Sequence, residues 1–87
     1  MDKTLNSPLH VKIVRFFHEN QSSIDTPRGV STWVREDRNR VRQVLEDLVS
    51  ARILVAHRSS STTGYGYTRN AKIVNKIEQF LKKRKPS

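Results

Sequence analysis

The chain has 87 residues, the size of one small domain, and such a domain buries only about 60–65% of its unfolded surface, so a spacious catalytic cleft or ligand cavity is not expected. Seventeen Lys and Arg against eight Asp and Glu give a formal charge of +9, which favours a polyanionic partner such as DNA, RNA or an anionic membrane surface. The sequence contains no cysteine, which excludes disulfides and thiolate metal sites and is compatible with a reducing compartment.

Targeting and membrane segments are not indicated. No apolar run approaches the ~20 residues that a membrane-spanning helix needs. The first ten residues lack the hydrophobic segment of a signal peptide. We therefore expect one domain over residues 1–87, with flexible tails at 1–6 and 83–87, in the cytoplasm.

The first predicted element is a helix over about residues 8–20. Ser7 followed by Pro8 is typical of a helix start, because the first helical position leaves its amide hydrogen unbonded and proline has none. His10 and His18 lie eight residues apart on this helix, but no carboxylate or thiol completes a set of metal ligands, so we expect packing roles and no metal. The apolar face is formed by Leu9, Ile13, Phe16 and Phe17.

A second, shorter helix follows. Before it, Ile24 is a lone apolar residue among polar neighbours, as in a very short strand or an anchored loop. Thr26 and Pro27 repeat the start signature and predict two to three helical turns that end near Arg35. The side chains expected to be buried are those of Val30 and Val34 and part of Trp33.

A third helix, over about residues 37–51, has the clearest pattern. Asp37 can cap its first turn. Four apolar residues recur at i, i+3, i+4 and i+7 and form one stripe that seeks the core: Val41, Val44, Leu45 and Leu48. Opposite this stripe lie Asn39, Gln43, Glu46 and Ser50, flanked by Arg40 and Arg42. The stretch alone is compatible with a solvated amphipathic helix and with a helix that reads base edges in a major groove.

Two extended runs and a last helix complete the chain. Residues 53–58 and 64–68 are β-rich and enclose a polar tip, so they predict a hairpin with Tyr65 and Tyr67 on one face; an ordinary solvated loop is the alternative. Thr68 should cap the last helix, and the chain ends in KKRKPS, which is either a solvated tail or an additional attraction for phosphates. The apolar face of the last helix is formed by Ile73, Val74, Ile77, Phe80 and Leu81.

The order of these elements carries a family resemblance. A capped short helix begins at Thr26, a valine stands at Val41, and paired leucines span 45–48. Residues 51–54 stand where such families carry Ala-Gly-Leu-Leu, and 65–71 is similar to their Tyr-x-Leu-Thr-x-x-Gly. The chain thus resembles the winged helix-turn-helix of small prokaryotic transcription regulators of the MarR, PadR and ArsR types. The resemblance implies an α+β fold, mainly helical: helix, short strand, helix, helix, hairpin wing, helix.

Three residues depart from the family pattern. Arg35 replaces the glycine of the turn, and Glu36 replaces the small apolar residue that packs it. Arg52 replaces the glycine after the third helix, so this helix must end without the residue best suited to a left-handed cap.

The resemblance and the positive charge together imply sequence-specific binding of double-stranded DNA by a transcription regulator associated with the nucleoid. The helix at 37–51 would enter the major groove, where amides suit adenine and arginines suit guanine or phosphate. The wing at 57–64 would reach the adjacent minor groove or backbone. The expected recognition residues are Arg38, Asn39, Arg40, Arg42 and Gln43. Expected backbone contacts come from Thr26, Arg28 and Thr32, and expected wing contacts from His57, Arg58, Ser60 and Thr62.

The acidic residues of the third helix limit this footprint. Glu46 and Asp47 lie in its second half, where their carboxylates would repel phosphates. Contact with DNA should therefore concentrate in the first two turns.

Other functions stay open. A winged-helix module that binds protein within a larger complex is the main alternative, and non-specific architectural DNA binding is another. RNA binding is a weaker interpretation, because no aromatic pair is placed to stack bases. Neither an enzyme, a cofactor, a small-molecule substrate nor a membrane role is expected, since no catalytic set of residues is grouped.

The oligomeric state is also open. The helices at 8–20 and 68–83 could pair two copies as a homodimer, and the residues suspected of this are Phe16, Phe80 and Leu81. A dimer would place two recognition helices about one duplex turn apart, whereas a monomer would bind a half-site.

Overall fold

The computed structural model describes residues 5 and 7–83. Its elements follow the predicted order and confirm a winged helix-turn-helix of the α+β class, mainly helical. Of the tails predicted at 1–6 and 83–87, all but Leu5 and Lys83 lie outside the described residues, and Lys83 is the last residue of α4. The elements are α1 (Pro8–Glu19), β1 (Ile24–Asp25), α2 (Pro27–Val34), α3 (Arg38–Ser50), β2 (Leu54–Arg58), β3 (Thr63–Tyr67) and α4 (Ala71–Lys83).

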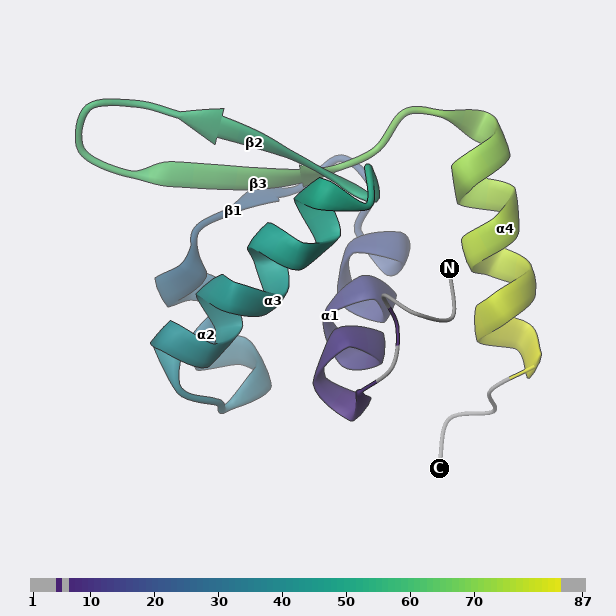
Figure 1. Ribbon diagram of the computed structural model, residues 1–87, viewed down its shortest axis with the longest axis horizontal. Coiled ribbons are helices and arrows are strands. Elements are labelled where there is room, and N and C mark those ends of the chain that lie inside the picture. The colour runs from purple at the N-terminus through teal and green to yellow at the C-terminus, as the bar shows by residue number, and fades with distance from the viewer. Residues whose placement is uncertain (1–4, 6, 84–87) are drawn as a thin grey trace.

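The elements are arranged around α1 and α3. α1 lies between α3 and α4, and α4 stands at the end of the molecule away from α2 (Figure 1). The strands form one antiparallel sheet in the order β1-β3-β2, with Ile24 opposite Gly66 and Leu54 opposite Tyr67. β2 and β3 extend past α3 as the hairpin wing (Figure 1).

Side chains cap the first three helices as predicted. Ser7 Oγ accepts from the His10 amide at 3.2 Å, and Thr26 Oγ1 accepts from the Gly29 amide at 3.1 Å. The Asp37 carboxylate accepts from the Arg40 amide at 3.1 Å. Each bond satisfies an amide that the first helical turn leaves without a backbone partner.

The turn between α2 and α3 is held without its usual residues. Arg35 adopts the left-handed conformation, with φ 60°, that glycine would adopt at lower cost. Ser31 Oγ donates to the Glu36 carbonyl at 2.6 Å, and Lys12 Nζ donates from α1 to the Val34 carbonyl at 3.1 Å. These polar bonds replace the apolar packing that a small residue at Glu36 would supply.

The core forms where α3 meets α1 and the sheet. The predicted stripe of α3 and both hairpin tyrosines are buried, which confirms the direction of these faces. Tyr67 keeps its hydroxyl bonded while its ring is buried, through a 3.0 Å hydrogen bond to His18 Nδ1. Trp33 is only partly buried, as predicted: it is 57% exposed, and its ring packs on Phe16 with centroids 4.6 Å apart.

Two expectations at the ends of the domain are corrected. Leu5 falls in the segment expected to be a flexible tail, but its side chain is 1% exposed and belongs to the core, because a leucine beside an apolar core gains by leaving water. Thr68 does not cap α4. The cap is Asn70, whose Oδ1 accepts from the amides of Lys72 at 3.0 Å and Ile73 at 3.3 Å. Thr68 instead continues the sheet, since its amide donates to the Ile53 carbonyl.

The suspected dimer residues are largely occupied within one chain. Phe16 and Leu81 are 8% and 6% exposed, and Phe80 is half-buried. A homodimer through α1 and α4 therefore stays a prediction, with less free apolar surface than the sequence suggested. Across the described part of the chain, no helix is both long and apolar enough to cross a lipid bilayer.

Candidate nucleic-acid interface

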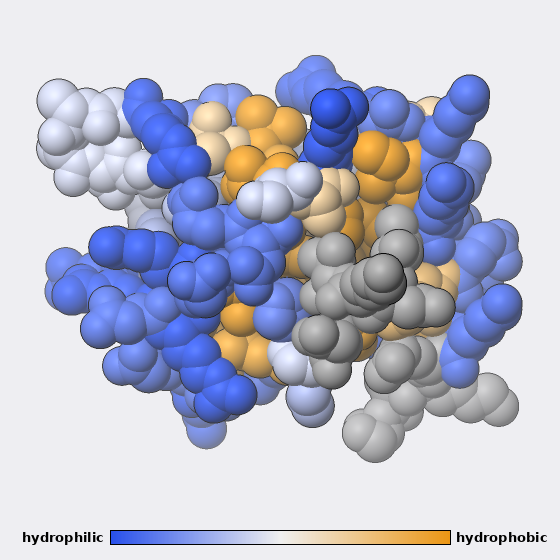
Figure 2. All heavy atoms as spheres, viewed as in Figure 1, coloured by the Kyte–Doolittle hydropathy of each residue, from blue (hydrophilic) through white to orange (hydrophobic). Residues whose placement is uncertain are grey.

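The first two turns of α3 present a polar, cationic surface. The buried stripe fixes the helix against the core, so the five predicted recognition residues are all exposed: Arg38, Asn39, Arg40, Arg42 and Gln43. Hydrophilic side chains cover the surface over α2 and the start of α3 (Figure 2). Among residues 5 and 7–83, no hydrogen bond or ion pair engages the side chains of the first four of these residues. They are free to meet a ligand without breaking an internal contact.

Glu46 is tied to the wing. Arg58 of β2 donates to both of its oxygens, at 2.9 and 3.3 Å, and the Tyr65 hydroxyl of β3 donates to Glu46 Oε2. The hydrogen bond from Arg58, followed by that from Tyr65, lowers the pKa of Glu46 below its ordinary value of 4.5. This network holds the hairpin at a fixed angle to α3.

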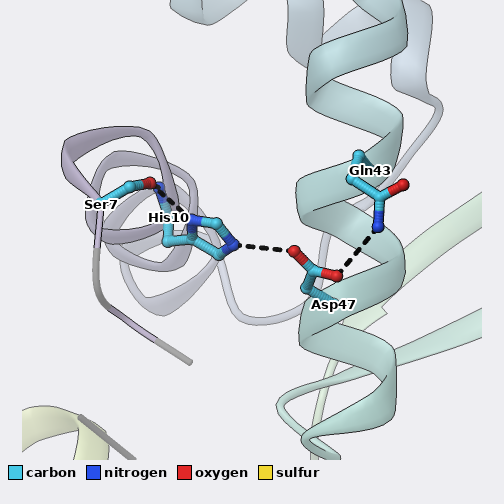
Figure 3. A network of polar contacts seen from close by, with 4 residues as sticks. All are labelled: Ser7, His10, Gln43 and Asp47. Carbon is cyan, nitrogen blue, oxygen red and sulfur yellow. Dashed lines mark hydrogen bonds and ion pairs between the residues drawn. The ribbon is translucent and has the colours of Figure 1, made fainter. Parts of the chain in front are cut away.

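Asp47 is tied to α1. Its Oδ2 lies 3.0 Å from His10 Nε2, and its Oδ1 accepts a hydrogen bond of 3.0 Å from Gln43 Nε2 (Figure 3). His10 is held in turn by Ser7, whose Oγ lies 2.5 Å from His10 Nδ1 (Figure 3). Both carboxylates of α3 are therefore bonded to neighbouring elements, and Asp47 is bonded to the recognition residue Gln43 as well.

The three α2 residues predicted to hold a DNA backbone differ in availability. Arg28 is exposed. Thr26 is half-buried and its hydroxyl oxygen caps α2, while Thr32 is exposed but donates to the Arg28 carbonyl at 3.0 Å. Arg28 is thus the α2 side chain best placed to reach outward.

The four residues predicted to contact DNA from the wing lie on different sides of the hairpin. Successive residues of a strand face opposite sides. Arg58 lies on the side of α3, whereas His57 lies on the outer face of the sheet, where its Nε2 is 3.5 Å from the place that a Cβ on Gly66 would take. Ser60 and Thr62 are exposed in the tip, which is closed by hydrogen bonds between residues 59 and 62.

A hollow of about 390 Å³ lies between α3 and the wing. Arg42 and Glu46 line it from α3, and Arg58, Tyr65 and the polar tip line it from the hairpin. Its walls carry guanidinium and hydroxyl groups, which are donors to phosphate oxygens, together with the Glu46 carboxylate, which is paired with Arg58.

The structure adds residues that the sequence interpretation did not assign to the site. Tyr65 and His10 each bind one of the two carboxylates of α3. The spacing of Gln43 and Asp47, four residues apart on one helix, signals the bond between those two, but no local spacing signals the contacts of Tyr65 and His10. Within the described residues, no group of three or more His, Cys, Asp or Glu side chains could hold a metal ion.

Solved structures resemble this chain at the level of the fold. The chain is similar to reduced HlyU from Vibrio cholerae, with a TM-score of 0.71, 12% identity, and 92% of this chain and 80% of that chain covered. The present chain therefore has a winged-helix fold. Rv0081 from M. tuberculosis gives 0.69 and 20% identity over 93% of this chain and 77% of that chain. A variant of ZitR from Lactococcus lactis gives 0.66 and 15% identity over 90% of this chain and 53% of that chain. These three proteins are winged-helix transcription regulators.

No family model matches this chain, and the search of curated proteins found no match. At 12–20% identity the structural likeness establishes the winged-helix fold alone. Any statement about function must rest on the site itself.

Proposed function

We propose that this protein is a transcription regulator that binds double-stranded DNA in a sequence-specific manner through α3. The observation that carries the proposal is the exposed surface of its first two turns, where three arginines and two amides extend from a helix whose opposite stripe is buried. These side chain types match the donor and acceptor pattern of base edges in a major groove.

The surrounding elements support this orientation. With α3 in the major groove, Arg42 at the wall of the hollow between α3 and the wing contacts a backbone phosphate, while the Glu46 carboxylate on the same wall stays paired with Arg58. Arg28 at the start of α2 reaches a phosphate on the other side, and Ser60 and Thr62 at the wing tip approach the adjacent minor groove. His57 lies on the outer face of the sheet and is left out of the proposed surface.

The net charge supports the same partner. The formal charge of +9 on 87 residues attracts a polyanion whatever its sequence, and specificity then comes from α3. We place such a regulator at the nucleoid, acting by binding and not by catalysis. A symmetric pair of these domains would require a palindromic site with half-sites about one duplex turn apart.

The test is selection from a random duplex library with the purified chain at two salt concentrations, followed by sequencing. We expect enrichment of one motif, and weaker binding as salt rises because phosphate contacts release counterions. Binding with a steep salt dependence but no motif would replace the proposal with an architectural role. No binding at the lower salt would overturn DNA as the partner and favour a protein-binding module.

A further inference from the structure

Gln43, the last of the five recognition residues, differs from the other four because its side chain is hydrogen-bonded to a residue of its own helix. Its Nε2 donates to Asp47 Oδ1 at 3.0 Å, one turn further along α3 (Figure 3). Asp47 is not a freely rotating acceptor, because its second oxygen lies 3.0 Å from His10 Nε2 on α1. His10 is 13% exposed in its side chain and is fixed on its other nitrogen by Ser7. A chain of contacts thus runs from the start of α1 to an outward-facing amide.

The chemistry of this chain fixes which way the amide faces. A carboxylate can only accept hydrogen bonds, so the NH₂ group of Gln43, and not its Oε1, must face Asp47. One of the two Nε2 hydrogens is then used inside the protein. The Nε2 hydrogen on the Cγ side can bond to Asp47. The other Nε2 hydrogen, on the Oε1 side, then forms an outward edge together with Oε1.

That outward edge offers one donor and one acceptor. In the major groove, adenine presents one acceptor, N7, and one donor, the N6 amino group, and so matches this edge. Guanine presents two acceptors, N7 and O6, so it would place Gln43 Oε1 against an acceptor unless the amide rotated to point both Nε2 hydrogens at the base. That rotation would withdraw from Asp47 the hydrogen that its Oδ1 accepts.

We propose that Asp47, held by His10, is a specificity-determining positioning residue that makes Gln43 read adenine and reject guanine. The inference rests on the proposed function, since it names the base that one residue of α3 selects. It also gives Asp47 a role other than repulsion of phosphates. Asp47 touches no base; it acts through Gln43.

The experiment compares binding to duplexes that differ at one base pair. The pair that Gln43 contacts is identified as the one whose preference disappears in Gln43→Ala. At that pair the parent should prefer adenine over guanine about tenfold, the range of a good bidentate contact. Asp47→Ala should lower this ratio to about twofold, because the amide can then turn. In the Gln43→Ala background, Asp47→Ala should leave the ratio unchanged.

The ratio of the affinities for the adenine and guanine duplexes separates an effect on positioning from an effect of charge. Removing the Asp47 carboxylate strengthens binding to every duplex alike, so this effect cancels between two duplexes of equal length. Glu36→Ala is the matched control, since it removes an exposed carboxylate that forms no hydrogen bond or ion pair among the described residues; its adenine-to-guanine ratio should equal that of the parent. His10→Ala should give an intermediate ratio, since Asp47 stays but loses its support from α1.

The outcomes distinguish the two proposals. One outcome is that the parent selects a motif while Asp47→Ala keeps the parent's preference for adenine over guanine at the base pair that Gln43 contacts. This result overturns the positioning role and leaves DNA binding intact. A Gln43 pair that is G·C in the selected motif does the same. A parent that selects no motif overturns the proposed function, and the role of Asp47 with it.

A measurement without DNA tests the contact itself. In NMR spectra of the free protein, the Gln43 side-chain amide should respond strongly to Asp47→Ala, whereas that of Asn39 should not, because Asn39 has no hydrogen bond to Asp47. Equal, negligible changes in both amides would remove the basis of the inference whatever the DNA data show.

Discussion

Four side chains in the first two turns of α3 reach solvent without a hydrogen bond to another described residue, whereas in the next turn Glu46 and Asp47 are each bound by another element. Arg58 and Tyr65 hold the first carboxylate from the wing, and His10 holds the second from α1. One helix therefore has a free half that can meet a ligand and an anchored half that sets its position. Changes in the two halves should separate into losses of binding and losses of stability.

The largest effect is expected in the free half. Arg42→Ala and Arg40→Ala should each weaken binding to the selected duplex by about 1–3 kcal/mol if the guanidinium reads guanine, with a relaxed preference at one base pair. If the arginine touches phosphate, the loss should be similar for all sequences and the salt slope should fall by about one unit. Titration of labelled duplexes at several salt concentrations distinguishes the two cases.

Arg42→Ala and Arg40→Ala should weaken DNA binding without reducing the stability of the fold. Both side chains are exposed and form no hydrogen bond among the described residues, so the free energy of unfolding should stay within about 0.5 kcal/mol of the parent. Lys76→Ala, on α4 at the far end of the molecule, is the control for loss of one positive charge. An arginine variant that binds every duplex as tightly as the parent would remove that residue from the proposed surface.

In the anchored half, Glu46→Ala should reduce the free energy of unfolding by about 1–2 kcal/mol at neutral pH, because the Arg58 and Tyr65 side chains lose an ionised acceptor that is partly exposed. Urea denaturation followed by circular dichroism measures the change. Glu36→Ala removes an exposed carboxylate without these partners and should stay near the parent. Equal stabilities of the two variants would mean that the wing is positioned by its apolar packing alone.

The same contact predicts a dependence on pH. The pKa of Glu46 is lowered in the folded chain, so its contribution is complete above the ordinary value of 4.5 and is lost as the pH falls through the lower folded value. The stability difference between the parent and Glu46→Ala should therefore be constant from pH 7 to about pH 5 and should shrink in more acidic solution. A difference that does not shrink would show that the ionised form is not what binds Arg58.

A smaller effect is expected at alkaline pH. Burial first, and then the hydrogen bond to Glu46, raise the pKa of Tyr65 above 10, and burial raises the pKa of Tyr67. Groups with a raised folded pKa stabilise the fold below the unfolded value and cease to do so as the pH rises through the folded one. Absorbance titration of phenolate should show both tyrosines ionising at higher pH in the folded chain than in urea. In Tyr65→Phe only Tyr67 remains, so the folded chain should show a single phenolate transition at higher pH than in urea.

Local patterns were enough to predict the helices and strands, and the family resemblance of their order gave the fold. Proline after Ser7 and Thr26 marked two helix starts, and the valine and leucine spacing of α3 gave its buried stripe, because both depend on residues within a few positions of each other. The cap of α4 was misassigned to Thr68 because Asn70 is an equally good cap two residues later. Spacing alone does not choose between them.

The recognition residues were predictable as an exposed set, but their partners were not. The bond between Glu46 and Arg58 joins residues twelve positions apart and exists only at the observed angle between wing and helix. The contact between His10 and Asp47 spans 37 positions and needs α1 packed beside α3. The burial of Leu5 depends in the same way on the assembled core. The roles of Arg58 and Asp47 therefore required the tertiary structure.

The smallest effects concern the residues that follow α2 and α3, where arginine adopts the left-handed conformation: Arg35 at φ 60° and Arg52 at φ 64°. Glycine removes the steric cost at these angles but loses more entropy on folding, so Arg35→Gly and Arg52→Gly should each raise the free energy of unfolding by only about 0.5–1 kcal/mol. Thermal unfolding followed by circular dichroism checks this. A loss of stability would mean that the arginine stem packs on its neighbours.

The two substitutions should differ in DNA binding, which makes them a matched pair. Arg35 lies in the turn that leads into the free half of α3, whereas Arg52 follows the anchored half. If the turn approaches the duplex backbone, Arg35→Gly should reduce the salt slope by about one unit, and Arg52→Gly should leave it nearly unchanged. An arginine kept at a strained position for its charge would then explain the departure from glycine at Arg35. Equal salt slopes for the two variants would show that the DNA backbone lies away from the turn, and the proposed contact would then be confined to α3 and the wing.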